Sequence, residues 1–119
     1  MAVITQNTGV SATKTPQALT RTVLTASDTF TFQRGSRQFI HIRNNAGSTF
    51  TAVFTGSAPS QVGVPGLGGV VDGTAGLSAA ITANAGIGLV LDLDQFFIYF
   101  GDGTVTLTGV SGCAAVLWN

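Results

Sequence analysis

Few residues in this sequence could support catalysis. The chain has one histidine, His41, one cysteine, Cys113, and no glutamate. A Ser-His-Asp device would depend on His41 alone, and zinc needs several His or Cys ligands that this pair does not supply. We interpret His41 as a structural or surface residue and Cys113 as a small core residue at the start of the last strand. The sequence therefore predicts no catalytic residue, no metal site and no cofactor.

Two aspartates, Asp92 and Asp94, are the other candidates for chemistry. Placed two apart on one strand, they would project from the same face, and such a carboxylate pair can bind calcium or cleave glycosides. They end a hydrophobic strand, however, and we expect them to pair with an arginine or to cap a turn. Gly66, Gly68 and Gly69 are not followed by the helix that a phosphate-binding loop requires. Both patterns favour structural roles, so we expect a protein that is not an enzyme.

Charged residues are scarce and are divided between the two halves of the chain. Hydrophobic residues make up 45% of the sequence and charged residues only 8%, with a net charge of zero, whereas soluble domains carry about 25% charged residues. All five basic residues precede the midpoint, and every acidic residue except Asp28 follows it. These charges either pair within the domain or form complementary poles that meet between neighbouring copies. A surface so poor in ions suits burial between subunits.

The same composition argues against nucleic-acid and membrane partners. Five scattered basic residues with no net positive charge do not form the stripe that phosphate binding needs. The uncharged residues 73–91 nearly reach membrane-spanning length, but their glycines disfavour a helix and no Lys or Arg flanks them. Residues 1–11 lack the basic and apolar regions of a secretory signal, which predicts synthesis in a cytoplasm.

Alternating hydrophobic residues predict β-strands along most of the chain. The expected strands cover residues 20–24, 29–32, 38–43, 49–55, 77–82, 87–93, 95–100, 104–108 and 113–118. Asn and Gly at 44–48 predict a turn, because both tolerate positive φ, and a hairpin between the strands beside it. A second tight hairpin is expected at 101–103. We expect one all-β domain, an antiparallel β-sandwich of jelly-roll or immunoglobulin-like type with about seven to nine short strands.

Two segments outside the regular strands are expected to make contacts. Residues 1–18 read as an extended N-terminal arm that could add a strand to a neighbour, and residues 19–119 form the sandwich. Within it, residues 56–76 form a long Gly-rich loop of the kind often used for contacts. The apolar residues of the arm and loop that would make these contacts are Val3, Ile4, Val62, Val64 and Leu67. Trp118, near the C-terminus, belongs either to the core or to an interface.

Four ordered segments carry a resemblance to a known family. Residues 28–32 (DTFTF), 37–44 (RQFIHIRN), 103–109 (GTVTLTG) and 114–117 (AAVL) are similar to small virion proteins of tailed bacteriophages, and resemble capsid decoration, or cement, proteins. The likeness covers roughly residues 20–117 and rests on strand rhythm and hairpin chemistry. It implies a β-sandwich that binds the outside of an icosahedral head, contacts the major capsid protein, and assembles as a homo-trimer or homo-dimer. It implies no active site.

Other functions stay open at this point. A receptor- or carbohydrate-binding module, such as a fibre tip, would use exposed aromatics beside an acid, and Phe97, Tyr99 and Asp94 are the residues for it. An enzyme would use Asp92 with Asp94. Within a virion, a neck, connector or tail component fits the sequence as a decoration protein does. The sequence therefore predicts a structural virion protein, with Phe97, Tyr99 and Trp118 as further interface candidates.

Overall fold

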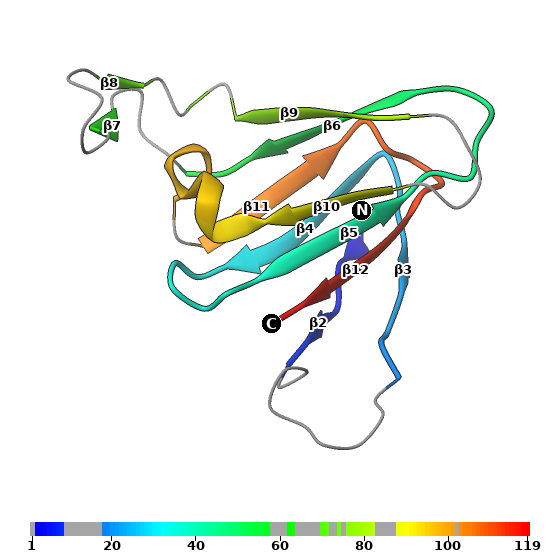
Figure 1. The fold of residues 1–119 in the computed structure, drawn as a ribbon, viewed down its shortest axis with the longest axis horizontal. Helices are drawn as coiled ribbons and strands as arrows, with labels where there is room; N and C mark the ends of the chain where they lie inside the picture. Colours follow the sequence, from blue (N-terminus) through cyan, green and yellow to red (C-terminus); the bar gives the residue numbers. More distant parts are fainter. Residues whose placement is uncertain are drawn as a thin grey trace.

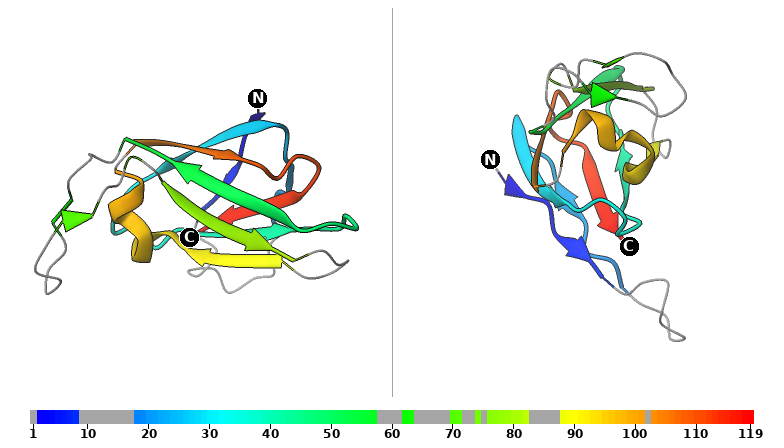
Figure 2. Two further views of the ribbon diagram at one scale, coloured as in Figure 1. Left: turned by 90° about the horizontal axis from the view of Figure 1, so that it is seen from above. Right: turned by 90° about the vertical axis from the view of Figure 1, so that its left-hand side faces the viewer.

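Two stacked sheets form the body of the protein in the computed structural model, which describes residues 2–8, 18–57, 62–63, 70–71, 74, 76–82, 88–101 and 103–119. Sheet A has the strand order β1 (Ala2–Val3), β4 (Ser27–Phe32), β11 (Gly103–Thr108), β6 (Phe50–Thr55) and β9 (Leu77–Ile81). Sheet B has the order β10 (Gly88–Asp92), β5 (Phe39–Arg43), β12 (Ala114–Trp118) and β2 (Gln6–Asn7), with β3 (Thr22–Val23) also paired to β12. Figure 1 shows sheet B in front of sheet A, and Figure 2 shows the two layers from other sides.

The chain changes sheet at nearly every connection. It passes from β3 in sheet B to β4 in sheet A, then to β5 in B and β6 in A, and later from β10 in B to β11 in A and β12 in B. The chain thus alternates between the two layers of a β-sandwich. The predicted all-β sandwich is thereby confirmed. The sheets are mixed rather than purely antiparallel, because β1 lies parallel to β4 and β2 lies parallel to β12.

The hairpin expected around residues 44–48 is wrong. β5 pairs with β10 and β12, whereas β6 pairs with β11 and β9, so the turn crosses from one sheet to the other. Both strands turn their hydrophobic side chains into the same core from opposite sides, which a hairpin within one sheet would not allow. The turn is held by the buried Asn44, whose Nδ2 donates to Ser48 O at 3.0 Å and whose Oδ1 accepts from Ala46 N at 2.9 Å. Among the described non-glycine residues only Arg37 has a positive φ, of 55°, so side-chain bonding makes this turn.

The strand expected at residues 95–100 is also wrong. Leu93–Tyr99 form the 3-10 helix η2, which Asp92 caps by accepting a hydrogen bond from Asp94 N. In a short run of aromatic and aliphatic residues, periodicity does not tell a buried strand from a helix. Here the N-terminal cap at Asp92 favours a helix. Because a helix and not a strand precedes β11, the β-hairpin expected at 101–103 is also wrong, and Asp102 lies outside the described residues.

Residues 2–7 of the expected arm are paired into the sandwich. β1 extends sheet A beside β4, and β2 extends sheet B beside β12. Between them, Ile4 N donates to Thr29 O at 2.8 Å, and the Ile4 side chain is only 2% exposed. With the two-residue strands β1, β2 and β3 included, the sheets hold more strands than the seven to nine expected. Residues 9–17 of the expected arm lie outside the described residues.

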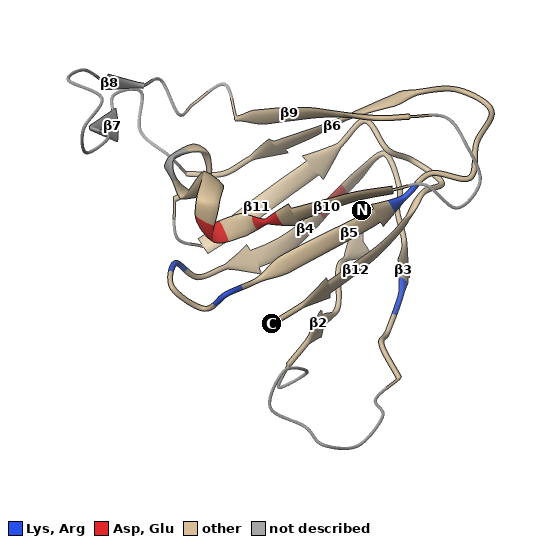
Figure 3. Ribbon diagram, viewed as in Figure 1, with Lys and Arg blue, Asp and Glu red and all other residues tan. Residues whose placement is uncertain are grey.

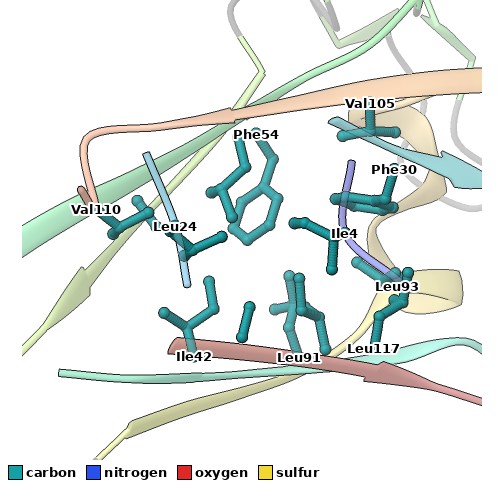
Figure 4. Close-up of a cluster of buried hydrophobic side chains, with 14 of the residues drawn as sticks. Ile4, Leu24, Phe30, Ile42, Phe54, Leu91, Leu93, Val105, Val110 and Leu117 are labelled. Carbon is teal, nitrogen blue, oxygen red and sulfur yellow. The ribbon is translucent and has the colours of Figure 1, made fainter. Parts of the chain in front are cut away.

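A single hydrophobic core fills the space between the sheets. The predicted inward side chains are buried: Ile40 and Ile42 from sheet B face Phe30, Phe54 and Val105 from sheet A. Figure 4 shows Ile42 from sheet B and Phe30, Phe54 and Val105 from sheet A meeting in this core, with Ile4 and Leu24 among them. Edge-on aromatic contacts link Phe30 to Phe54 and Phe32 to Phe100. Each such side chain stabilises the fold by about 1.5 to 3 kcal/mol on burial.

The long loop at residues 56–76 is described only in part. Val62–Gly63 form β7 and pair with Val70–Val71, which form β8. Residues 109–112 connect β11 to β12, and Gly109 and Gly112 have positive φ. In the part of the chain that the structure describes, no helix has the length and apolar character needed to cross a membrane.

Candidate functional site: the outer face of sheet B

The residues considered first for chemistry lie apart in the fold. His41 points outward from β5, since its neighbours Ile40 and Ile42 point into the core. Cys113 is 2% exposed and belongs to the core, and burial raises the pKa of its thiol. Within the described ranges, no group of three or more His, Cys, Asp or Glu residues is placed to hold a metal ion. Because His41 points outward and Cys113 lies in the core, the two residues are on opposite sides of sheet B.

The two aspartates do not share one strand face. Asp92 ends β10, whereas Asp94 lies in η2. The Asp92 carboxylate accepts from Asp94 N at 3.2 Å, and the two oxygens of Asp94 accept from Gly35 N at 2.8 Å and Arg37 N at 2.9 Å. Their predicted capping role is confirmed, because Asp92 caps η2 and Asp94 caps the turn between β4 and β5. Their predicted common face is wrong.

The aromatic residues considered for glycan binding are partly covered by the protein itself. The Arg34 guanidinium carbon lies 3.7 Å from the centre of the Phe97 ring, so it covers one face of that ring. Phe97 and Tyr99 are partly buried against the core. Asp94 already accepts two backbone hydrogen bonds. The structure thus brings the three residues onto one helix but engages each of them internally.

The outer side of sheet B carries an apolar surface that the core does not use. We call it the sheet B face, and it consists of the outward residues of four neighbouring strands: Val23, Phe39, His41, Arg43, Val90, Asp92, Ala114, Val116 and Trp118. Alternation along each strand places these side chains opposite the core residues. Figure 1 looks onto this face.

The sheet B face exposes large hydrophobic side chains. Val23 is 68% exposed and Val90 is 60% exposed. Phe39 and Trp118 stack with ring centres 5.8 Å apart and planes 22° apart, and both stay partly exposed. Val116 lies in register between them and Ala114, opposite His41. Adjacent apolar positions of this kind are typical of a contact surface.

Two charged residues occupy opposite ends of the sheet B face. Arg43 ends β5, and Asp92 ends β10 at the other end of this strand pair, as Figure 3 shows. The Nε atom of Arg43 is buried and has no hydrogen-bond partner in the described part of the protein. The remaining described charged residues lie elsewhere: Arg21 before β3, Arg34 and Arg37 in a turn, Asp94 in η2, and Asp28 buried on the inner side of β4.

The outer side of sheet A has a different chemistry. Its outward residues are mostly hydroxyl-bearing, and they include Ser27, Thr29, Thr31, Thr51, Thr55, Ser78, Thr104, Thr106 and Thr108. No charged residue is among the described outward positions of this sheet. A cleft of about 410 Å³ near β1 and β2 is lined by uncharged residues, Gln6, Gln33 and Gln38 among them. In the described residues, neither the outer side of sheet A nor this cleft presents a charged side chain to a ligand.

The interface residues expected from the sequence have different surroundings. Val3 is 73% exposed on the outer side of β1, Ile4 is buried in the core, and Trp118 lies on the sheet B face. The backbone of Val62 is in β7, and Val64 and Leu67 lie outside the described residues. Sequence reasoning missed Val23, Val90 and Arg43 as members of one surface. The signal for Arg43 was present, because it alternates with Ile40 and Ile42.

Comparison of the chain with protein families, with curated proteins and with solved structures found no match in any of the three.

Proposed function

We propose that this chain is a structural protein of a virion, and most specifically a decoration protein that binds the outer surface of a phage head and stabilises it by contacts between subunits. The single observation that carries this proposal is the poverty of charge on both outer sheet faces. Arg43 and Asp92 are the only charged residues at described outward positions of the two sheets. A sandwich with such an exterior is suited to being covered by other chains.

The described chemistry supports a mechanical role over a catalytic one. Among the described acidic residues, Asp92 and Asp94 accept backbone hydrogen bonds and Asp28 is buried. His41 and Cys113 face opposite sides of sheet B. Contacts made by many identical copies on a shell add up through avidity, so each one is allowed to be weak. The phage assignment itself rests on the resemblance of the β4, β5, β11 and β12 segments to decoration proteins.

The test is fractionation of particles from cells that encode this chain. Lysates are separated on a density gradient, and each fraction is probed with an antibody against the chain and quantified by mass spectrometry. A decoration protein sediments with intact heads and holds a fixed molar ratio to the major capsid protein. Detection of the chain only in slowly sedimenting fractions, with heads that lack it, contradicts the proposal.

The same gradient separates heads from tails. After heads and tails are dissociated and resolved, a decoration protein stays with the heads. A chain that follows the tails is a neck or tail component, and the decoration assignment is then wrong although the virion assignment holds.

A further inference from the structure

Arg43 and Asp92 are the only charged residues of the sheet B face, and they lie at its opposite ends. In the β5–β10 register, Gly88 lies beside Arg43 and Asp92 lies beside Phe39. The two charged residues are thus four positions apart along the strands and one strand apart sideways. With standard strand spacing their Cα atoms are separated by about 14 Å. Arg43 and Asp92 of one copy therefore do not pair with each other.

We infer that copies of this chain pack against one another through the sheet B face, with Arg43 of one copy paired to Asp92 of the next. Each copy carries one positive and one negative group on the same surface, so the surface is complementary to itself. Because every copy supplies both members of the pair, two copies stacked face to face form two such pairs and close into a symmetric dimer with no charge left over.

The centre of the face suits such packing. Val90 and His41 lie level with each other on adjacent strands, halfway between Arg43 and Asp92, and Val116 is the next residue across the sheet. Stacking two such faces removes the exposed Val90 and Val23 side chains from water. The Phe39–Trp118 pair adds aromatic area at one end. An apolar surface that includes an aromatic pair and carries its few charges toward the ends is the composition that protein interfaces favour.

The charge pair gives this surface a direction that hydrophobic contact alone lacks. Packing between apolar faces is non-directional, whereas opposite charges at fixed positions select one orientation and penalise others in which like charges meet. The outer side of sheet A offers no comparable feature, because none of its described outward positions carries a charge. The sheet B face is therefore the surface through which the chain recognises itself.

This inference goes beyond the virion assignment, since it concerns the purified chain alone. Its test needs no particle, and particle binding is measured separately by gradient fractionation. A monomer that sediments with heads would refute self-association and leave the proposed function intact. An oligomer that does not sediment with heads would support self-association and contradict the proposed function.

The decisive experiment reverses the two charges singly and together. The full chain is prepared unaltered and as Arg43→Glu, Asp92→Arg and the double variant Arg43→Glu/Asp92→Arg, and molar mass is measured by size-exclusion chromatography with light scattering. We expect a dimer of the 12.1 kDa chain for the unaltered protein. Each single variant brings like charges together and weakens association by at least about tenfold. The double variant restores opposite charges and returns to the mass of the unaltered protein.

A second pair of variants guards against a folding defect, because Asp92 also caps η2. Val90→Lys places a charge at the centre of the sheet B face at a residue that is already 60% exposed. Thr104→Lys makes a matched change on the exposed outer side of β11 in sheet A. Circular dichroism and thermal melting establish that both variants are folded. We expect a monomer for Val90→Lys and an unchanged oligomer for Thr104→Lys.

Three results would overturn the inference. The first is an unaltered chain that is monomeric at the highest soluble concentration. The second is a Val90→Lys variant that is folded and still oligomeric. The third is a double charge reversal that is folded but no more associated than the single variants, since this shows that Arg43 and Asp92 do not meet.

Discussion

Gln38 is buried where β4 turns toward β5, and its amide group is fully hydrogen-bonded. Its Nε2 donates to Gln6 Oε1 and to Thr31 O, both at 2.8 Å. Its Oε1 accepts from Gln33 N at 2.8 Å and from Ser36 Oγ at 3.0 Å. These four bonds tie β2 in sheet B to β4 in sheet A and to the turn between β4 and β5. Gln38 is thus a structural link between the sheets.

Replacing this amide by a carboxylate tests that role. Gln38→Glu removes both donated bonds and sets a charged oxygen against the carbonyl oxygen of Thr31. We expect the free energy of unfolding to fall by about 2 to 4 kcal/mol, because a buried group loses its partners. Urea denaturation measures the loss, and Gln33→Glu at an exposed position is the matched control, with a change within about 0.5 kcal/mol. Equal effects in the two variants would show that Gln38 is not a link.

Asp28 is a second buried polar residue whose role was not evident from sequence. It is fully buried, and its carboxylate accepts from Thr25 N at 2.8 Å, from Thr25 Oγ1 at 2.7 Å and from Ala2 N at 3.2 Å. The bond to Ala2 fixes the start of β1 against β4. In the sequence Asp28 stood out only as the single early acid, and nothing local indicated which backbone groups it would meet.

Cys113 gives the fold a dependence on alkaline pH. Burial raises the pKa of the Cys113 thiol above its ordinary value. The unfolded chain therefore releases this proton at a lower pH than the folded chain does, so the folded state binds more protons in that interval. Stability from this group is complete below the ordinary thiol pKa and is lost as pH rises through the raised value.

The variant Cys113→Ala isolates this effect. Denaturation midpoints are measured for both chains from neutral pH upward, and the difference between them is plotted against pH. We expect the advantage of the unaltered chain to shrink on the alkaline side, because only that chain carries the thiol. A difference that stays constant with pH would show that the thiol titrates alike in both states.

At the scale of elements, the segment from β1 to β2 joins the two sheets. β1 is hydrogen-bonded to sheet A, β2 to sheet B, and Ile4 between them is buried in the core. Val3, its neighbour, is 73% exposed. Adjacent residues of similar chemistry therefore make different contributions to folding.

This difference predicts the outcome of two alanine substitutions. Ile4→Ala is expected to lower the free energy of unfolding by about 2 to 4 kcal/mol, because it removes buried methyl groups and leaves a cavity. Val3→Ala is expected to change it by less than about 0.5 kcal/mol. Denaturation of the two variants under the same conditions measures both. Similar small effects would restore the hypothesis of an arm that is independent of the sandwich.

Periodicity predicted the strands well where one side of the strand is buried. The alternation in 38–43, 49–55 and 104–108 located β5, β6 and β11 and their inward residues. It failed at η2, where apolar residues follow one another without alternation and Asp92 caps the start of a helix. It also failed for β1 and β2, since two-residue strands carry no period and depend on partners distant in sequence.

The pairing of strands was less predictable than their existence. The turn at 44–48 was located correctly, but a turn signal does not say whether the next strand stays in the same sheet. That choice depends on which core the following strand fills, and β6 fills the shared core from sheet A. The sheet B face was missed for the same reason, because Val23, Val90 and Arg43 come together only after β3, β5, β10 and β12 have paired.

At the scale of the whole molecule, the sandwich has a well-packed interior and an exterior with few ions. Its core combines side chains from both sheets and from the β1–β2 segment. Its exterior combines the apolar sheet B face with the hydroxyl-rich outer side of sheet A. A zero net charge offers little repulsion between copies. We therefore expect this protein to work as one of many contacting copies.

Sedimentation equilibrium of the purified full chain, from micromolar to hundreds of micromolar, tests this expectation most directly. If neighbouring chains cover the exterior, the weight-average mass rises above 12.1 kDa with concentration and levels off at a small multiple of it. A mass that stays at 12.1 kDa over the whole range, in a chain that remains soluble, would contradict it.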